Sequence, residues 1–195
     1  VSSMGGVEIA CDDWGVDVCV TGPNKCFEAV PGISFISVGH RAWDLVDSYP
    51  AGRGHGWFLD LRTWRKYDQE WGSWHPSPVT LPSNCILAVL TSLRTITERG
   101  LPAHFARYTR ASRAVRAGLQ NVGFEMFVDD AFASPVVTGV KARPEFEISE
   151  LVKFLSEEHN MAIGGGLGAL AGKIFRIGHL GKAAENEYLS DFLTA

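Results

Sequence analysis

The sequence lacks several features that would place the chain in a special class of proteins. Among its 195 residues, no apolar run approaches the roughly 20 residues that a membrane-spanning helix needs. Basic residues are not in excess either, because 18 Lys and Arg stand against 22 Asp and Glu, for a formal net charge of −4. Proteins that bind a phosphate backbone are usually basic. We therefore expect neither a membrane protein nor a nucleic-acid-binding protein.

Cysteine is scarce and histidine is scattered. The four cysteines show no C-x-x-C spacing, and a disulfide-stapled domain is usually shorter and denser in cysteine. We interpret Cys11, Cys19, Cys26 and Cys85 as free thiols in a reducing compartment, the cytoplasm. The six histidines show no H-x-x-x-H spacing, so we expect no metal site.

Apolar residues make up 46% of the chain, which is enough for a sizeable core. Apolar and polar alternation predicts strands over residues 15–21, 32–39, 124–128, 135–142 and 173–179. Three-and-four spacing predicts helices over residues 84–99, after Pro102, and over 147–159 and 183–195. Residues 43–80 are aromatic and rich in Pro and Gly, so we expect an irregular segment there. The alternation of helices and strands indicates an α/β fold, with a boundary near Gly100.

One lysine occupies an unusual place. Lys25 lies within "VTGPNKCFEAVPG", residues 20–32, between an apolar strand and a Pro-Gly turn. A lysine at the end of a strand is usually a solvated turn residue, because buried lysines are rare. The alternative is a nucleophilic amine, which attacks a carbonyl only when unprotonated and so needs desolvation or a nearby cation. Val20, Phe27 and Val30 could form the wall of such a dry pocket, and the residues alone leave both readings open.

Three segments together resemble a known family. "DVCVTGPNKCFEAVPG", residues 17–32, resembles the cofactor-lysine segment of class V pyridoxal-phosphate aminotransferases of the alanine–glyoxylate aminotransferase group. "VSSMGG", residues 1–6, resembles the strand that follows the aspartate at the cofactor ring in that family. "GGGLGALAGKIFRIGHLG", residues 164–181, resembles its substrate-carboxylate arginine segment. The versions "TGPNKC" and "RIGHLG" are especially similar to the pyridoxamine–pyruvate aminotransferases, which are close relatives.

The resemblance implies a role for five residues. Lys25 would form the Schiff base with pyridoxal phosphate and carry the α-proton, while the cofactor acts as the electron sink. Arg176 would hold the substrate carboxylate, because its planar fork meets two oxygens at once. Asn24 would contact the cofactor, and Thr80 would reach the cofactor phosphate of the partner subunit in a homodimer with shared active sites. Val1 would pack against the cofactor ring.

The resemblance also implies that the chain is the C-terminal half of an aminotransferase with the aspartate aminotransferase-like α/β fold. The aspartate at the ring nitrogen would lie two residues before Val1. Residues 1–99 would then complete the large cofactor-binding domain, and residues 100–195 would form the small C-terminal domain.

The implied activity is transfer of an amino group from a small amino acid, alanine or serine, to a small 2-oxo acid, glyoxylate or pyruvate. Two alternatives remain open. One is a pyridoxamine–pyruvate aminotransferase, which takes free pyridoxamine as the donor. The other is a non-catalytic fragment that needs the missing N-terminal half.

Overall fold

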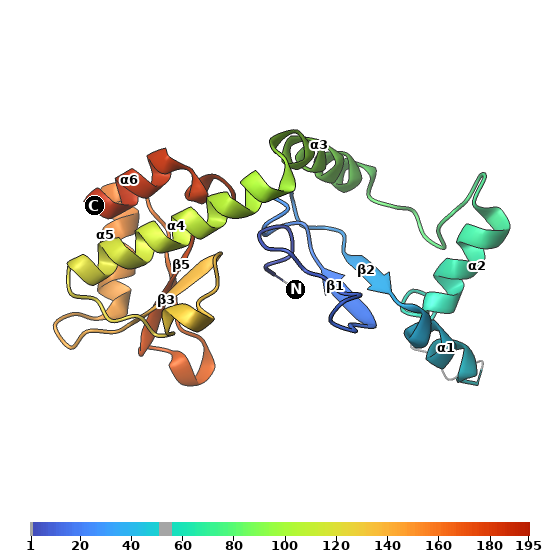
Figure 1. Ribbon diagram of the computed structural model, residues 1–195, viewed down its shortest axis with the longest axis horizontal. Helices are drawn as coiled ribbons and strands as arrows, with labels where there is room; N and C mark the ends of the chain where they lie inside the picture. Colours follow the sequence, from blue (N-terminus) through green and yellow to red (C-terminus); the bar gives the residue numbers. More distant parts are fainter. Residues whose placement is uncertain (1, 51–55) are drawn as a thin grey trace.

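The computed structural model describes residues 2–50 and 56–195, which form two parts joined by two long helices (Figure 1). Helix α3, Ser83–Arg99, ends where helix α4, Leu101–Asn121, begins. Gly100 separates them with a φ of 81°, a conformation that glycine adopts without a steric cost. Its N–H donates to the carbonyl of Ile96 at 3.0 Å and closes α3. No helix in the described ranges has both the length and the apolarity needed to cross a bilayer.

The first part is built on a small hairpin. Strand β1, Val18–Thr21, pairs antiparallel with strand β2, Phe35–Val38. The predicted strands over 15–21 and 32–39 are therefore present but shorter. The hairpin loop carries Lys25, so β1 and β2 fix the position of that segment.

The expectation of an irregular segment over residues 43–80 is wrong. Helices α1, His40–Ser48, and α2, Leu61–Trp71, lie in this stretch. Helix α2 begins after Asp60, whose carboxylate accepts a hydrogen bond from the Arg62 N–H at 3.0 Å. Its aromatic residues follow helical spacing, and the rings of Tyr67 and Trp71 lie 4.6 Å apart. The many Trp, Pro and Gly residues around these helices led us to expect loops, although the aromatic residues of α2 recur with helical spacing.

The second part packs helices on a three-stranded sheet. The strand order is β3, Val137–Lys141, then β5, Ile174–Gly178, then β4, Gly164–Gly165, and both pairings are antiparallel. Helices α5, Ile148–His159, and α6, Asn186–Thr194, follow β3 and β5, as predicted for residues 147–159 and 183–195. Short 3-10 turns cover Asp130–Phe132, Gly168–Leu170 and Gly181–Ala184.

The predicted strand over 124–128 does not form. Met126 makes an isolated bridge with Val140 of β3, and the N–H of Phe127 donates to Gly139 O at 2.9 Å. The chain then leaves the sheet, because Asp129 caps the 3-10 turn that begins at Asp130. This local turn ends the pairing before a full ladder is made.

The main core lies between α4 and the second sheet. Tyr108, Ala111, Val115 and Leu119 of α4 recur at three-and-four spacing and are buried. They belong to the same cluster as Val140 and Phe175 of β3 and β5. Full burial of such a side chain contributes roughly 1.5–3 kcal/mol, so this interface is the principal source of stability for the second part.

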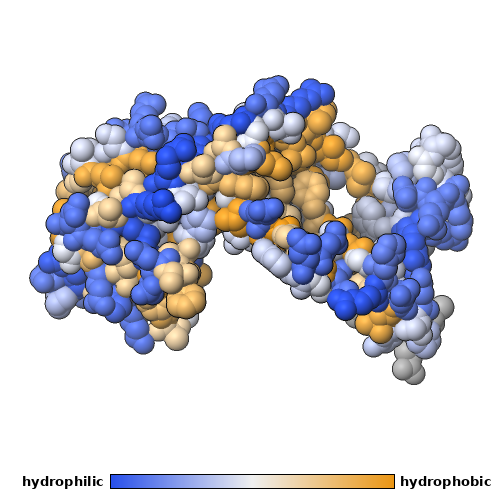
Figure 2. Space-filling view, viewed as in Figure 1, coloured by the Kyte–Doolittle hydropathy of each residue, from blue (hydrophilic) through white to orange (hydrophobic). Residues whose placement is uncertain are grey.

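Apolar side chains of the first part stay exposed. Leu87 and Leu90 of α3 and Ile36 of β2 are 60%, 41% and 51% exposed. Figure 2 shows hydrophobic residues gathered over α3 and beside the hairpin. Isolated exposed leucines are ordinary, but a contiguous surface of this kind marks a place where another surface binds.

Candidate functional site

Lys25 lies in the loop that follows β1. Lys25 and Asn24 are exposed, whereas Pro23 and Cys26 beside them are buried. The Glu28 N–H donates to Lys25 O at 2.9 Å, and the Ala29 N–H donates to Pro23 O at 3.0 Å. These backbone hydrogen bonds close the turn and present the Lys25 amine at its surface.

Among the described residues, Val20, Phe27 and Val30 do not form the apolar pocket wall that was considered for Lys25. Val20 and Val30 are 45% and 50% exposed, because the strand and its loop turn these side chains away from the core. Phe27 is partly buried, with its ring 5.7 Å from that of Phe35. Any desolvation of the amine therefore requires contacts beyond those of this chain's own described residues.

A polar cluster holds the turn from the side of α4. Glu28, three residues after Lys25, adopts a φ of 58°, which side-chain-bearing residues rarely do. Its carboxylate accepts a hydrogen bond from the Tyr108 hydroxyl at 2.6 Å and forms an ion pair with Arg107. His104, Arg107 and Tyr108 stand at three-and-four spacing on one face of α4, so they reach the turn together.

Burial sets the protonation of this cluster. It lowers the pKa of His104 and raises the pKa of Tyr108, and the Glu28 carboxylate adds to the latter rise. Burial also raises the pKa of the Cys26 thiol to about 11, so this thiol stays protonated near neutral pH. Burial opposes the charge of Arg107, but Glu185 and Glu28 outweigh it and raise the pKa of that guanidinium. The cluster therefore holds a permanent cation between two carboxylates.

Arg176 lies in the middle of β5, paired with Gly164 of β4. It is partly buried, and its Nε donates to Gly165 O at 2.9 Å. A Cβ at Gly164 would lie 3.4 Å from Nη2, so the glycine keeps space beside the guanidinium. Within residues 2–50 and 56–195, the Nη nitrogens have no hydrogen-bond or ion-pair partner. Such a fork can take a carboxylate on its outer edge.

Two of the predicted site residues line the same cavity. Asn24 and Thr80 line one cavity of about 1300 Å³ between the hairpin, α2 and α3, and Thr80 is exposed in it. Lys25 and Arg176 are not among the residues that line this cavity. Val1 lies outside the described residues.

Sequence reasoning missed the cluster around Arg107. His104, Arg107 and Tyr108 fall in the helix predicted after Pro102, but Arg107 and His104 carry no recognised motif. The sequence signal that could have identified them is their place on the inner face of a helix, because ionisable residues that are buried there need polar partners. The identity of those partners was not readable from spacing.

Several relatives of the chain are aminotransferases by name, and two, from Synechococcus sp. and Anabaena cylindrica at 33% and 32% identity, are named subunits of a soluble hydrogenase. No protein-family model matches the chain. An uncharacterised aminotransferase of Methanocaldococcus jannaschii is 36% identical over 190 residues, which are 97% of this chain and 48% of that protein. The pyridoxamine–pyruvate transaminase of Mesorhizobium japonicum is 31% identical over 196 residues, which are 100% of this chain and 49% of that protein.

A solved structure agrees with the fold. The alanine–glyoxylate aminotransferase of Nostoc sp. superposes with a TM-score of 0.91 at 30% identity, over 100% of this chain and 50% of that one. The expected fold class, part of an α/β aminotransferase fold, is confirmed. The chain spans about half the length of the curated relatives it matches. The chain is therefore similar in sequence and fold to about half of an alanine–glyoxylate or a pyridoxamine–pyruvate aminotransferase.

Proposed function

We propose that the full-length protein carrying this chain is a pyridoxal-phosphate-dependent class V aminotransferase, with residues 1–99 in its large domain and 100–195 as its small domain. It moves an amino group from a small amino acid, alanine or serine, to a small 2-oxo acid, glyoxylate or pyruvate. The observation that carries this proposal is similarity to named aminotransferases along the whole chain, including both the Lys25 and the Arg176 segments.

The donor groups of the chain fit this cofactor in kind. An aldehyde and a phosphate call for an amine and for hydrogen-bond donors, which Lys25, Asn24 and Thr80 supply from exposed positions. Asn24 directly precedes Lys25 and is exposed like it, which supports placing the cofactor at this turn. Pyridoxal phosphate, when bound, supplies the electron sink that makes the bond at the substrate's α-carbon breakable.

The chain's own residues would supply binding and proton transfer. Lys25 Nζ would take the proton from the α-carbon of the donor and return it, in the same half-reaction, to the carbon on the other side of the transferred nitrogen; the second half-reaction reverses these steps with the acceptor. Arg176 binds the carboxylate through its two Nη nitrogens, since Nε is already engaged by Gly165 O. Both substrates carry a carboxylate beside the reacting carbon, so one arginine serves the donor and the acceptor in turn.

The proposal includes a homodimer in which Thr80 reaches the partner's cofactor. The exposed apolar surface of α3 and the hairpin supports a further binding surface there. We also place the protein in the cytoplasm, and the four free cysteines support a reducing compartment.

Borohydride reduction with pyridoxal phosphate, followed by peptide mass mapping, tests the central role of Lys25. We expect a pyridoxyl mark confined to Lys25 in the full-length protein. The Lys25→Ala variant should lack both this mark and transaminase activity. Labelling spread over surface lysines, with activity kept in the variant, would contradict the proposal. A mark in the full-length protein but none in the 195-residue chain alone would mean that the fragment is non-catalytic by itself.

A second candidate differs in the donor. Pyridoxamine–pyruvate transaminase of M. japonicum aligns with the entire chain at 31% identity, which favours pyridoxamine as a donor and pyruvate as an acceptor. Initial rates with pyridoxamine, alanine and serine at matched concentrations separate the two. Turnover of pyridoxamine, with no burst or steady rate for either amino acid, would select this second function.

A further inference from the structure

We propose that Arg107 is a positioning residue that holds the Lys25 turn and the segment following the Arg176 strand in one fixed arrangement. The inference rests on the proposed function, because it concerns the relative placement of the two groups assigned to the reaction. No contact of Arg107 with substrate or cofactor is invoked.

The contacts of Arg107 join the two segments directly. Its Nη2 donates to the carboxylate of Glu28, three residues after Lys25. Its Nη1 donates to Gly181 O at 3.3 Å and to the Glu185 carboxylate at 2.5 Å. Gly181 lies five residues after Arg176, so one guanidinium spans both motifs.

The two segments also meet without the arginine's help. Gly181 has a φ of 57°, and a Cβ there would lie 3.7 Å from Glu28 Cγ. Glu28 itself has a φ of 58°. Glu28 thus takes up a backbone conformation of low intrinsic population where its side chain approaches Gly181, and such conformations persist when surrounding contacts fix them.

The guanidinium is suited to fixing directions. Its side chain is only 5% exposed, and it lies over the Tyr108 ring at 4.7 Å. A planar fork binds partners along set directions, whereas a lysine ammonium is a point charge without such preference. Buried ion pairs often add little net stability, and their better-attested use is to select one arrangement of the chain. We therefore infer that the ion pairs of Arg107 serve to fix the relative positions of the two segments.

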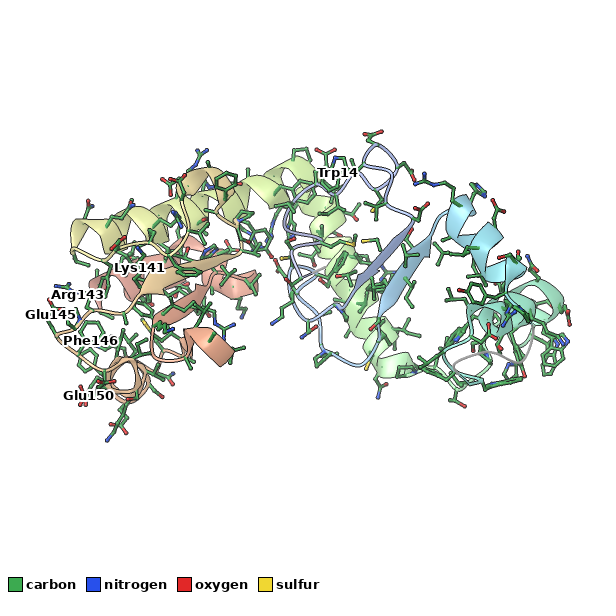
Figure 3. The ribbon with its side chains drawn as sticks, turned by 90° about the horizontal axis from the view of Figure 1, so that it is seen from below. Trp14, Lys141, Arg143, Glu145, Phe146 and Glu150 are labelled. Atoms are coloured by element: carbon green, nitrogen blue, oxygen red, sulfur yellow. The ribbon has the colours of Figure 1, made fainter. Side chains whose placement is uncertain are left out.

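The decisive variant is Arg107→Lys in the full-length protein loaded with pyridoxal phosphate. The matched control is Arg143→Lys, because Arg143 also pairs with a glutamate, Glu145 at 3.3 Å, and lies over an aromatic ring, Phe124 at 5.3 Å. Figure 3 shows Arg143 and Glu145 together at the outer end of the second part, remote from the hairpin. A general effect of replacing a stacked, paired arginine would appear in both variants.

We expect Arg107→Lys to lower kcat on the order of 100-fold, because a misplacement of about 1 Å has that effect on a reacting pair. The KM values for the amino donor and the 2-oxo acid should stay within about threefold of the wild-type values, since Arg176 still binds the carboxylates. The circular dichroism of the cofactor's visible band, per mole of bound cofactor, should fall, because it reports a fixed orientation. Unchanged kcat and dichroism, or equal losses in Arg143→Lys, would overturn the proposal.

Hydrogen exchange without cofactor tests the linkage independently of activity. Amides in residues 25–30 and 179–185 should exchange faster together in Arg107→Lys, by about tenfold, and keep their rates in Arg143→Lys. Unchanged exchange in either segment refutes the linkage, even if the wild type gives no mark at Lys25 and the proposed function fails.

If Arg107→Lys does not fold, Glu28→Gln replaces it, because this variant keeps the shape of the side chain and removes one charge of the network. It should lower kcat and loosen both segments in the same direction, and wild-type values in Glu28→Gln would refute the inference.

Discussion

Acidification should destabilise the protein through His179, which directly follows β5. This side chain is 1% exposed, and its Nε2 lies 3.0 Å from the Thr138 hydroxyl of β3. Burial lowers its pKa from the ordinary 6.5 to about 4, and the charge of Arg116 acts in the same direction. The nearby backbone of Pro135 opposes this only in part.

The sign and size of the effect follow from proton linkage. The unfolded chain binds a proton at His179 as the pH falls through 6.5, whereas the native state resists until about 4. The contribution to stability is therefore intact above 6.5 and is lost progressively down to about 4. A difference of this size corresponds to about 3 kcal/mol, because one pKa unit corresponds to about 1.4 kcal/mol.

Urea unfolding of the full-length protein at a series of pH values between about 7 and about 4 measures this loss. The comparison is with His179→Asn, which keeps a group able to hydrogen-bond Thr138 but has no proton to take up. Buried His104 and the carboxylates titrate in both proteins, so their effects cancel in the difference. The exposed His40→Gln variant is the control for removing any histidine.

The wild type should lose about 3 kcal/mol more than His179→Asn over this range, while His40→Gln follows the wild type. At about pH 7 the Asn variant should be the less stable of the two, by about 1–2 kcal/mol, from imperfect packing and hydrogen bonding. Parallel pH profiles for the wild type and His179→Asn would refute the assignment of the acid sensitivity to this buried imidazole.

Two further predictions concern the second sheet. Arg176→Leu should raise the KM for the amino donor and for the 2-oxo acid alike, each by about 100-fold, because hydrogen bonds from a charged group contribute about 1.5–3 kcal/mol. Steady-state kinetics measures this, and a change for one substrate alone would contradict a shared carboxylate site. Gly166→Ala should lower the free energy of unfolding by about 3 kcal/mol, because its Cβ would lie 2.0 Å from the backbone oxygen of Leu170. In the control Gly139→Ala the Cβ would meet Phe127 at an ordinary 3.4 Å, so equal losses by urea titration would show that the contact at Gly166 is not the cause.

Local sequence patterns predicted most of the helices. The apolar period over 84–99 gives α3, Ser83–Arg99, and that over 147–159 gives α5, Ile148–His159, within a residue or so. The apolar period indicates a helix in both segments, although α3 buries Val89 and Ile96 and leaves Leu90 on the same face exposed. Helix α2 was not predicted, because its helical period is carried by Trp and Tyr among turn-forming neighbours. Packing between these aromatic rings stabilises the helix.

The candidate site divides in the same way. Lys25, Arg176, Asn24 and Thr80 were identified by resemblance of short segments, and their roles stay predictions. That Asn24 and Thr80 line one cavity could not be read from those segments. Cavities arise between elements that are distant in the chain, so no local pattern encodes their lining.

By itself the sequence determined the α/β alternation, the places of the principal helices and the two motifs, because each depends on neighbours within a few residues. Only the tertiary structure decided that Arg107 lies between Glu28 and Glu185, which are 79 and 78 residues away along the chain. It also decided which ionisable groups are buried, and hence that the pKa of His179 falls while Lys25 stays exposed. Burial and long-range charge pairing depend on how the whole chain packs, and that packing is set by all the elements together.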